Sequence, residues 1–180
     1  MGRGSLAVRG GFLSPRPDYV LGCDPGLSGA LALLNLSTRK IHAIWDMPLK
    51  GGKIHPEGVA MVIDLAKSIA SAQLVAAVEN VNARPRQAGT WAFALGVGII
   101  HGCLASQGVP IHLVAPVQWK GSYGLLRVAD ESQASTKTRA RVLASKLWPE
   151  HAADFKRVKD ADRAEASLIG RFWASKNGWL

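Results

Sequence analysis

Cysteine is scarce in this sequence. Among 180 residues only Cys23 and Cys103 are cysteines, each inside an apolar run, and their spacing matches no metal-ligand motif. We therefore expect reduced thiols, a reducing cytoplasmic compartment and no structural zinc.

Long apolar stretches are also missing. The longest, from Trp91 to Leu104, is interrupted by three glycines and a histidine and is shorter than the roughly 20 residues of a membrane helix. Association with a membrane by a spanning helix is therefore not expected.

Acidic residues are outnumbered. The chain has 22 Lys and Arg against 13 Asp and Glu, a formal net charge of +9 and a pI of about 10.0. Such a charge favours a polyanionic partner, either nucleic acid or an anionic membrane surface. Residues 1–17 contain three arginines and no acid. Residues 18–180 therefore have nineteen basic and thirteen acidic side chains, a formal net charge of +6. The remaining length suits one domain.

The first seventeen residues are rich in Gly, Ser, Pro and Arg. This composition is typical of a mobile basic tail. An organelle transit peptide is the alternative, because such peptides are also rich in Arg and poor in acids. We interpret residues 1–17 as a tail and residues 18–180 as a single domain.

Apolar runs alternate with turn signals along the domain. Three short runs in succession are typical of antiparallel strands: they are Tyr19–Asp24, Ala30–Leu36 and Ile41–Met47. Later strands alternate with helical patterns: strands at Leu74–Glu79 and Val109–Val114, and helices from Pro56, over 88–107, from Pro116, over 135–148 and over 162–176. The order predicts an α/β domain with a mixed five-stranded sheet, its first three strands antiparallel, flanked by helices.

Two carboxylates end apolar strands, Asp24 after YVLGC and Glu79 after LVAAV. A buried carboxylate is unfavourable unless it is compensated, and two adjacent ones repel each other. If the two strands are neighbours, a hard divalent cation with oxygen ligands resolves the conflict. Taken singly, Asp24 also fits a turn residue and Glu79 a surface acid on an edge strand.

A third acidic group lies in KDADRAEASLIGRFW, where Asp162 and Glu165 are spaced to share one face of a helix. Four convergent carboxylates are what a two-metal phosphodiesterase needs, with its ions about 3.5–4 Å apart. The competing interpretation is a pattern similar to a capping box, with Asp in place of Ser or Thr.

The segments GCDPGLSGALALL, VAAVENV, GTWAFALGVGIIHGCLASQGVPIHLVAPVQWK and KDADRAEASLI occur in this order and cover most of the chain after Tyr19. With them the sequence resembles the RuvC family of Holliday junction resolvases, and its phage and chloroplast members more than the bacterial ones. The resemblance implies an RNase H-like fold, a homodimer and paired nicks in a four-way DNA junction. It also implies two Mg²⁺ ions per active site, replaceable by Mn²⁺, and no small-molecule cofactor.

The resemblance carries over to particular positions. Asp24 and Glu79 match the first two metal-binding acids of the family, and Asp162 and Glu165 match the last pair. Relatives that read KDHGRAEA place an acid at Asp160 instead, which keeps Asp160 as the alternative third ligand. Helical geometry favours Asp162, because five residues of helix turn Asp160 about 140° from Glu165. Lys120 matches a family lysine near the catalytic centre.

Basic side chains in the second half are candidates for DNA binding through phosphate contacts, and a solvated helix face is the alternative for each. The candidates are Lys120, Lys137, Arg141, Lys156 and Lys159. Bacterial family members carry a base-stacking aromatic after the second acid. Here that stretch reads NVNARPR, so Arg84 or Arg86 is expected to take its place by stacking or phosphate contact.

Three other functions were weighed against the nuclease. An actin-like ATPase or sugar kinase needs a second similar domain, for which 180 residues leave no room. A non-catalytic nucleic-acid-binding relative would be expected to lack an acid, whereas every position here is filled. A nuclease for another substrate, such as an RNA–DNA hybrid, stays open.

Overall fold

The computed structural model describes residues 16–71, 73–81 and 90–180. Five strands form the main sheet: β1 (Tyr19–Asp24), β2 (Ala30–Asn35), β3 (Lys40–Asp46), β6 (Leu74–Glu79) and β7 (Ile111–Val114). Their order across the sheet is β3-β2-β1-β6-β7. The first three are antiparallel to one another, whereas β6 runs parallel to both β1 and β7. The expected mixed five-stranded sheet is therefore confirmed.

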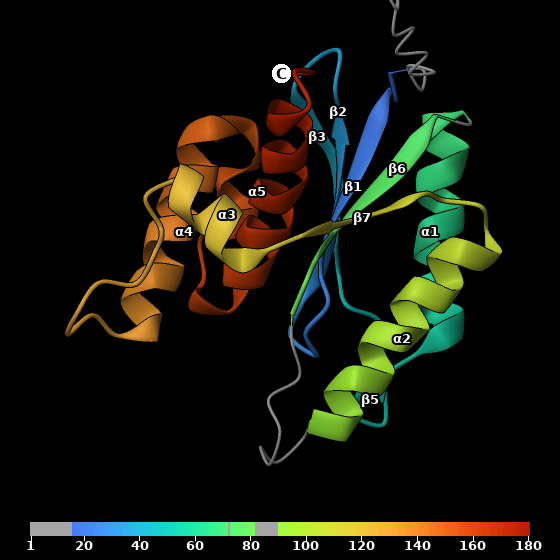
Figure 1. Ribbon diagram of the computed structural model, residues 1–180, viewed down its shortest axis with the longest axis horizontal. Coiled ribbons are helices and arrows are strands. Elements are labelled where there is room, and N and C mark those ends of the chain that lie inside the picture. Colours follow the sequence, from blue (N-terminus) through green and yellow to red (C-terminus); the bar gives the residue numbers. More distant parts are fainter. Residues whose placement is uncertain (1–15, 72, 82–89) are drawn as a thin grey trace, which may run out of the picture.

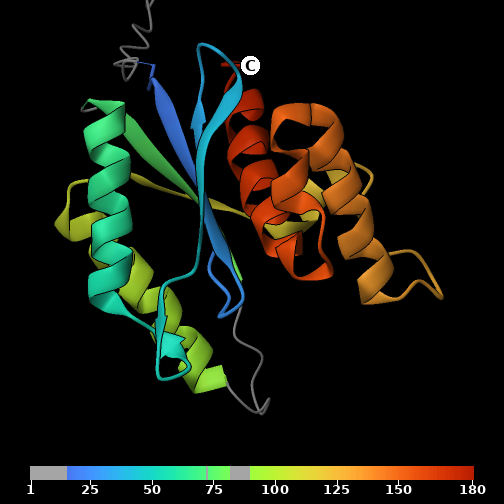
Figure 2. The ribbon, with the colours of Figure 1, turned by 180° about the vertical axis from the view of Figure 1, so that it is seen from behind.

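Helices cover both faces of this sheet. On one face lie α1 (Pro56–Ala70) and α2 (Thr90–Ser106), and on the other lie α3 (Pro116–Ser122), α4 (Gln133–Leu147) and α5 (Ala161–Lys176) (Figures 1 and 2). Of the second group, α5 packs directly on β1 and β2, and α4 packs on the outer side of α5. In the described part of the chain no helix has the length and apolarity that crossing a bilayer demands.

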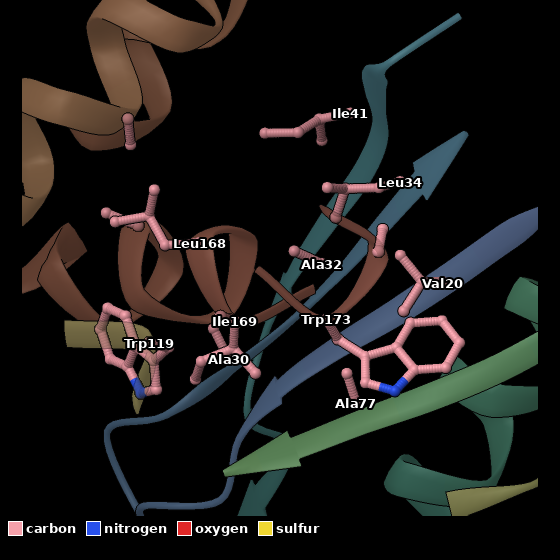
Figure 3. Close-up of a cluster of buried hydrophobic side chains, with 14 of the residues drawn as sticks. Val20, Ala30, Ala32, Leu34, Ile41, Ala77, Trp119, Leu168, Ile169 and Trp173 are labelled. Atoms are coloured by element: carbon pink, nitrogen blue, oxygen red, sulfur yellow. The ribbon is translucent and has the colours of Figure 1, made fainter. Parts of the chain in front are cut away.

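Side chains alternate between the two faces of β1 and so feed two cores. Leu21 and Cys23 join the cluster beneath α1 and α2. Val20 joins the cluster on the α5 side. There, Leu168, Ile169 and Trp173 of α5 lie over Ala30, Ala32 and Ala77 of the strands (Figure 3). The same alternation directs Gly22 and Asp24 of β1 toward α5.

The helix α5 comes unusually close to β1, and two glycines permit this approach. A methyl group on Gly22 would overlap the backbone carbonyl oxygen of Ala166 and the backbone of Gly170. Any larger residue at Gly22 would push α5 away from the sheet. Because α5 also carries Asp162 and Glu165, the contact sets the distance between those acids and the end of β1.

The expected elements match the observed ones to within a few residues at their ends. Two features were missed. A small hairpin, β4 (Leu49–Lys50) and β5 (Lys53–Ile54), turns through Gly51 and Gly52, which both have positive φ. Between the helices expected over 135–148 and 162–176, the structure has two 3₁₀ helices, η1 (Pro149–Phe155) and η2 (Val158–Asp160).

Most of the predicted N-terminal tail lies outside the described residues. Its last arginine, Arg16, donates hydrogen bonds to the carbonyl oxygens of Leu36 (3.0 Å) and Trp179 (3.1 Å). Arg16 therefore ties the residue after β2 to the C-terminal end of the chain.

Candidate active site

Asp24 is the last residue of the central strand and begins a tight turn. Its Oδ1 accepts a hydrogen bond from the backbone N–H of Gly26 at 3.2 Å. Gly29 closes the turn with its N–H bonded to the Gly26 carbonyl, and a methyl group at Gly29 would overlap the carbonyl oxygen of Asp24. The DPGLSG segment thus holds the Asp24 carboxylate at the end of the sheet.

Glu79 ends the neighbouring parallel strand. The register pairs Cys23 with Val78, so the next residues, Asp24 and Glu79, end adjacent strands on the same side. The indole Nε1 of Trp119 donates a buried hydrogen bond of 2.8 Å to Glu79 Oε1. One oxygen of Glu79 is therefore held by α3, and Glu79 lines the pocket described below.

The remaining two acids come from the first turns of α5. Asp162 and Glu165 are each only 5% exposed. One carboxylate oxygen from each lies within 4.8 Å of the other and of an oxygen of Asp24. Asp24 thus meets two acids that lie about 140 residues later in the sequence.

A polar pocket of about 220 Å³ opens over these acids. Its lining residues come from five elements and the turn after β1: they are Asp24, Ser28, Glu79, Lys120, Gln133, Thr136, Lys137, Asp162 and Glu165. Two cations balance the acids in part. Lys120 Nζ lies 3.4 Å from Glu165 Oε2, and Lys137 Nζ lies 2.6 Å from Asp162 Oδ1.

The electrostatics of this pocket favour a cation. Burial, together with the charges of Glu79 and the two α5 acids, raises the pKa of Asp24 to about 8. Burial also raises the pKa of Glu165, although Lys120 opposes this. Burial lowers the pKa of Lys137, but the hydrogen bond to Asp162 and the charges of the neighbouring carboxylates raise it by more, so the pKa of Lys137 lies above its usual value.

When all groups are ionised, the four carboxylates and two ammonium groups of the pocket carry a net charge of −2. Oxygen ligands from carboxylates are the donor set that Mg²⁺ and Mn²⁺ prefer. The residues present therefore fit a hard divalent cation held by Asp24, Asp162 and Glu165, with Glu79 beside them.

Asp160, the alternative third ligand, lies in a different arrangement. It is 1% exposed, and both its oxygens accept hydrogen bonds from Arg157, at 2.7 Å from the backbone N–H and 2.9 Å from Nη2. Arg163 Nη1 lies 3.9 Å from the same carboxylate. The Nε and Nη2 atoms of Arg163 donate to the two oxygens of Asp46, at 2.5 and 2.6 Å. The structure brings Asp162, and not Asp160, to the other acids.

The basic residues expected to bind DNA fall into separate groups. Lys120 and Lys137 line the acidic pocket. Arg141 donates to the carbonyl oxygens of Phe155 and Lys156 and so ties η1 to α4. Lys156 and Lys159 are exposed beyond it. Arg84 and Arg86 lie outside the described residues.

Four residues of the site were missed by sequence reasoning: Ser28, Trp119, Gln133 and Thr136. Trp119 stands beside Lys120 in sequence, which was a usable signal. The other three are common polar residues in a turn and on a helix, and only the packing of α4 on α5 brings that helix to the pocket.

Comparison with known proteins supports the fold. No family model matches the sequence. Among solved structures, the chain is similar to Thermus thermophilus RuvC in complex with a Holliday junction substrate, with a TM-score of 0.56 and 17% identity over 88% of this chain and 96% of that one. Another T. thermophilus RuvC structure matches with the same TM-score and coverage at 16% identity.

At this identity the likeness establishes a RuvC-like, RNase H-like fold, which confirms the fold expected from the sequence. Chemistry has to be argued from the site itself. Placement in the phage and chloroplast branch stays a prediction.

Proposed function

We propose that this protein is a divalent-metal-dependent endonuclease of the RuvC family, in its phage and chloroplast branch, that resolves four-way DNA junctions by paired nicks. The observation that carries the proposal is the convergence of Asp24, Asp162 and Glu165 within 4.8 Å, beside Glu79 in a pocket lined by two lysines. These acids end two adjacent strands and begin one helix, so the whole fold is needed to assemble them.

In this proposal the four acids hold two Mg²⁺ ions. When bound, such ions supply an activated water nucleophile and charge stabilisation at the scissile phosphate. The hydrogen bond from Trp119 fixes the rotamer of Glu79, so its carboxylate is already oriented in the pocket before an ion binds. Lys120 lies beside Glu165 and is placed to stabilise negative charge that develops on the phosphate.

DNA would be held mainly by phosphate contacts. Lys137 lies at the pocket, and Lys156 and Lys159 are exposed lysines that we propose as further phosphate contacts. Arg141 contributes charge while it anchors η1. Such contacts make affinity strongly dependent on salt. Arg84 and Arg86, expected after the second acid, are proposed to contact the bases or phosphates at the junction.

Paired nicks require two active sites, which we propose come from a homodimer. The helix α2 supports this because its outer side is apolar without a cover in the described part of the chain. Trp91 and Leu95 are 81% and 51% exposed. A methyl group on Gly98 or Gly102 would meet nothing within 4 Å. Sedimentation of wild type beside Leu95→Glu tests this: we expect a dimer that the substitution dissociates.

Cleavage assays test the function directly. Labelled four-way junction, linear duplex and RNA–DNA hybrid are incubated with Mg²⁺ or EDTA, beside Asp24→Asn. We expect Mg²⁺-dependent symmetric nicks in the junction alone, abolished by the substitution. Cleavage of the hybrid instead would agree with the metal-dependent mechanism but would show that the substrate is an RNA–DNA hybrid and not a four-way junction. Junction binding without cleavage in Mg²⁺ or Mn²⁺ would contradict the enzymatic proposal.

A further inference from the structure

The helix α4 carries an unexplained buried hydroxyl at its N-terminal end. Ser132 caps the helix through a hydrogen bond from the N–H of Ser135 (3.1 Å). One turn later, Thr136 is 8% exposed, and its Oγ1 is buried without a hydrogen-bond partner among the described residues. A buried hydroxyl that lacks a partner destabilises the folded state.

The usual partner of a threonine inside a helix is the carbonyl oxygen four residues earlier. Here that carbonyl, of Ser132, accepts the N–H of Thr136 at 3.3 Å, but the hydroxyl does not bond to it. The fold therefore gives no structural reason for a hydroxyl at this position. A valine, which has nearly the same shape, would fill the same space without the penalty.

The location of Thr136 suggests what the hydroxyl is for. It lines the acidic pocket next to Lys137, together with two other neutral hydrogen-bonding residues, Ser28 and Gln133. The carboxylates of this pocket suit a cation, but a phosphate group entering it also needs donors for its oxygens. Lys120 and Lys137 are both paired with acids. Among the described residues that line the pocket, Thr136 alone has a buried side-chain polar atom without a hydrogen-bond partner.

We propose that Thr136 Oγ1 donates a hydrogen bond to a non-bridging oxygen of the scissile DNA phosphodiester. The role rests on the nuclease function proposed above and deepens it. In the free protein Oγ1 is covered and has no partner among the described residues. In this proposal the side chain turns about χ1 when DNA binds, and the hydroxyl then faces the phosphate in the pocket that Thr136 lines. An uncharged donor adds contact to the phosphate without repelling a bound metal ion.

Three variants test the proposal. Thr136→Val removes the hydroxyl and keeps the shape, and Thr136→Ser keeps the hydroxyl. Thr138→Val is the matched control, because Thr138 lies on the same helix, is exposed, and accepts only from Arg141 at 3.2 Å. For each, the single-turnover cleavage rate of a four-way junction is measured across a Mg²⁺ titration, and stability is measured by thermal unfolding without DNA.

We expect Thr136→Val to unfold at the same or a higher temperature than wild type. Its cleavage rate should fall about 10- to 100-fold at saturating Mg²⁺, the range for losing a hydrogen bond to a charged group. The Mg²⁺ concentration for half-maximal rate should stay the same. Thr136→Ser should retain most activity, and Thr138→Val should match wild type.

Other outcomes overturn the role. A cleavage rate of Thr136→Val within twofold of wild type would mean that the hydroxyl makes no contact with the phosphate. A fall in activity and unfolding temperature together would assign Thr136 a structural role, and a higher Mg²⁺ requirement alone would assign it to the metal. A wild-type protein that cleaves no substrate is a separate result, which overturns the proposed function and this role with it.

Discussion

Replacement of Asp24 by asparagine is expected to stabilise the metal-free protein while abolishing its activity. In the absence of metal, burial and the other three acids raise the pKa of Asp24 to about 8, from 3.8. Between these two values the unfolded chain has lost a proton that the folded protein keeps. Stability therefore falls as pH rises from about 4 to about 8. Asparagine has no proton to lose and removes this dependence.

The magnitude follows from the same pKa. Each pH unit of this linkage is worth about 1.4 kcal/mol, so wild type gives up about 4 kcal/mol between pH 4 and pH 7. Asparagine Oδ1 can still accept the Gly26 N–H that Asp24 accepts. Because neighbouring acids titrate together and share the effect, we expect Asp24→Asn to be about 2–4 kcal/mol more stable at pH 7.

Urea unfolding followed by circular dichroism measures this, in EDTA, at pH 5, 6, 7 and 8. Asp64→Asn is the control, because Asp64 is an exposed acid on α1, outside the pocket. Added Mg²⁺ should stabilise wild type more than Asp24→Asn, since a ligand stabilises the state that binds it. If Asp24→Asn were less stable than wild type at pH 8 in EDTA, or if the stability of wild type rose with pH, the Asp24 carboxyl would not keep its proton in the folded protein.

Four further substitutions separate the roles of individual residues. Asp162→Asn should abolish cleavage with little loss of stability. Asp160→Asn should retain cleavage but lower the free energy of unfolding by about 1–3 kcal/mol. Cleavage assays and urea unfolding of the two variants measure this. Trp119→Phe should cost about 1–3 kcal/mol, because it leaves a buried oxygen of Glu79 without its donor, and should raise the Mg²⁺ concentration for half-maximal cleavage. Gly22→Ala should cost at least about 1–3 kcal/mol through overpacking against α5, seen as a lower unfolding temperature. A Gly22→Ala protein as stable as wild type would show that α5 can move without penalty.

The sheet was predictable because its strands are short apolar runs, each closed by a turn or an acid. The Asp24 and Glu79 positions followed from the same pattern, since both acids end such runs. The small hairpin was missed because two-residue strands carry no periodic pattern, although two glycines between Lys50 and Lys53 are a hairpin signal.

The site was only partly predictable, for a physical reason. The choice between Asp160 and Asp162 depends on where α5 begins. The structure ends η2 at Asp160 and starts α5 at Ala161, which leaves Asp160 bonded to Arg157. Lys137 was expected to contact DNA, but not to lie 2.6 Å from an acid 25 residues away. Such contacts depend on how helices pack, which local sequence does not encode.

We propose that the pocket of Asp24, Asp162 and Glu165 holds catalytic divalent metal. Anomalous X-ray scattering from crystals soaked in Mn²⁺, collected for wild type and Asp24→Asn, tests this. We expect anomalous peaks between these three carboxylates in wild type, with at least one lost in the variant. An empty pocket in wild type at millimolar Mn²⁺, or peaks only at other surface acids, would contradict it.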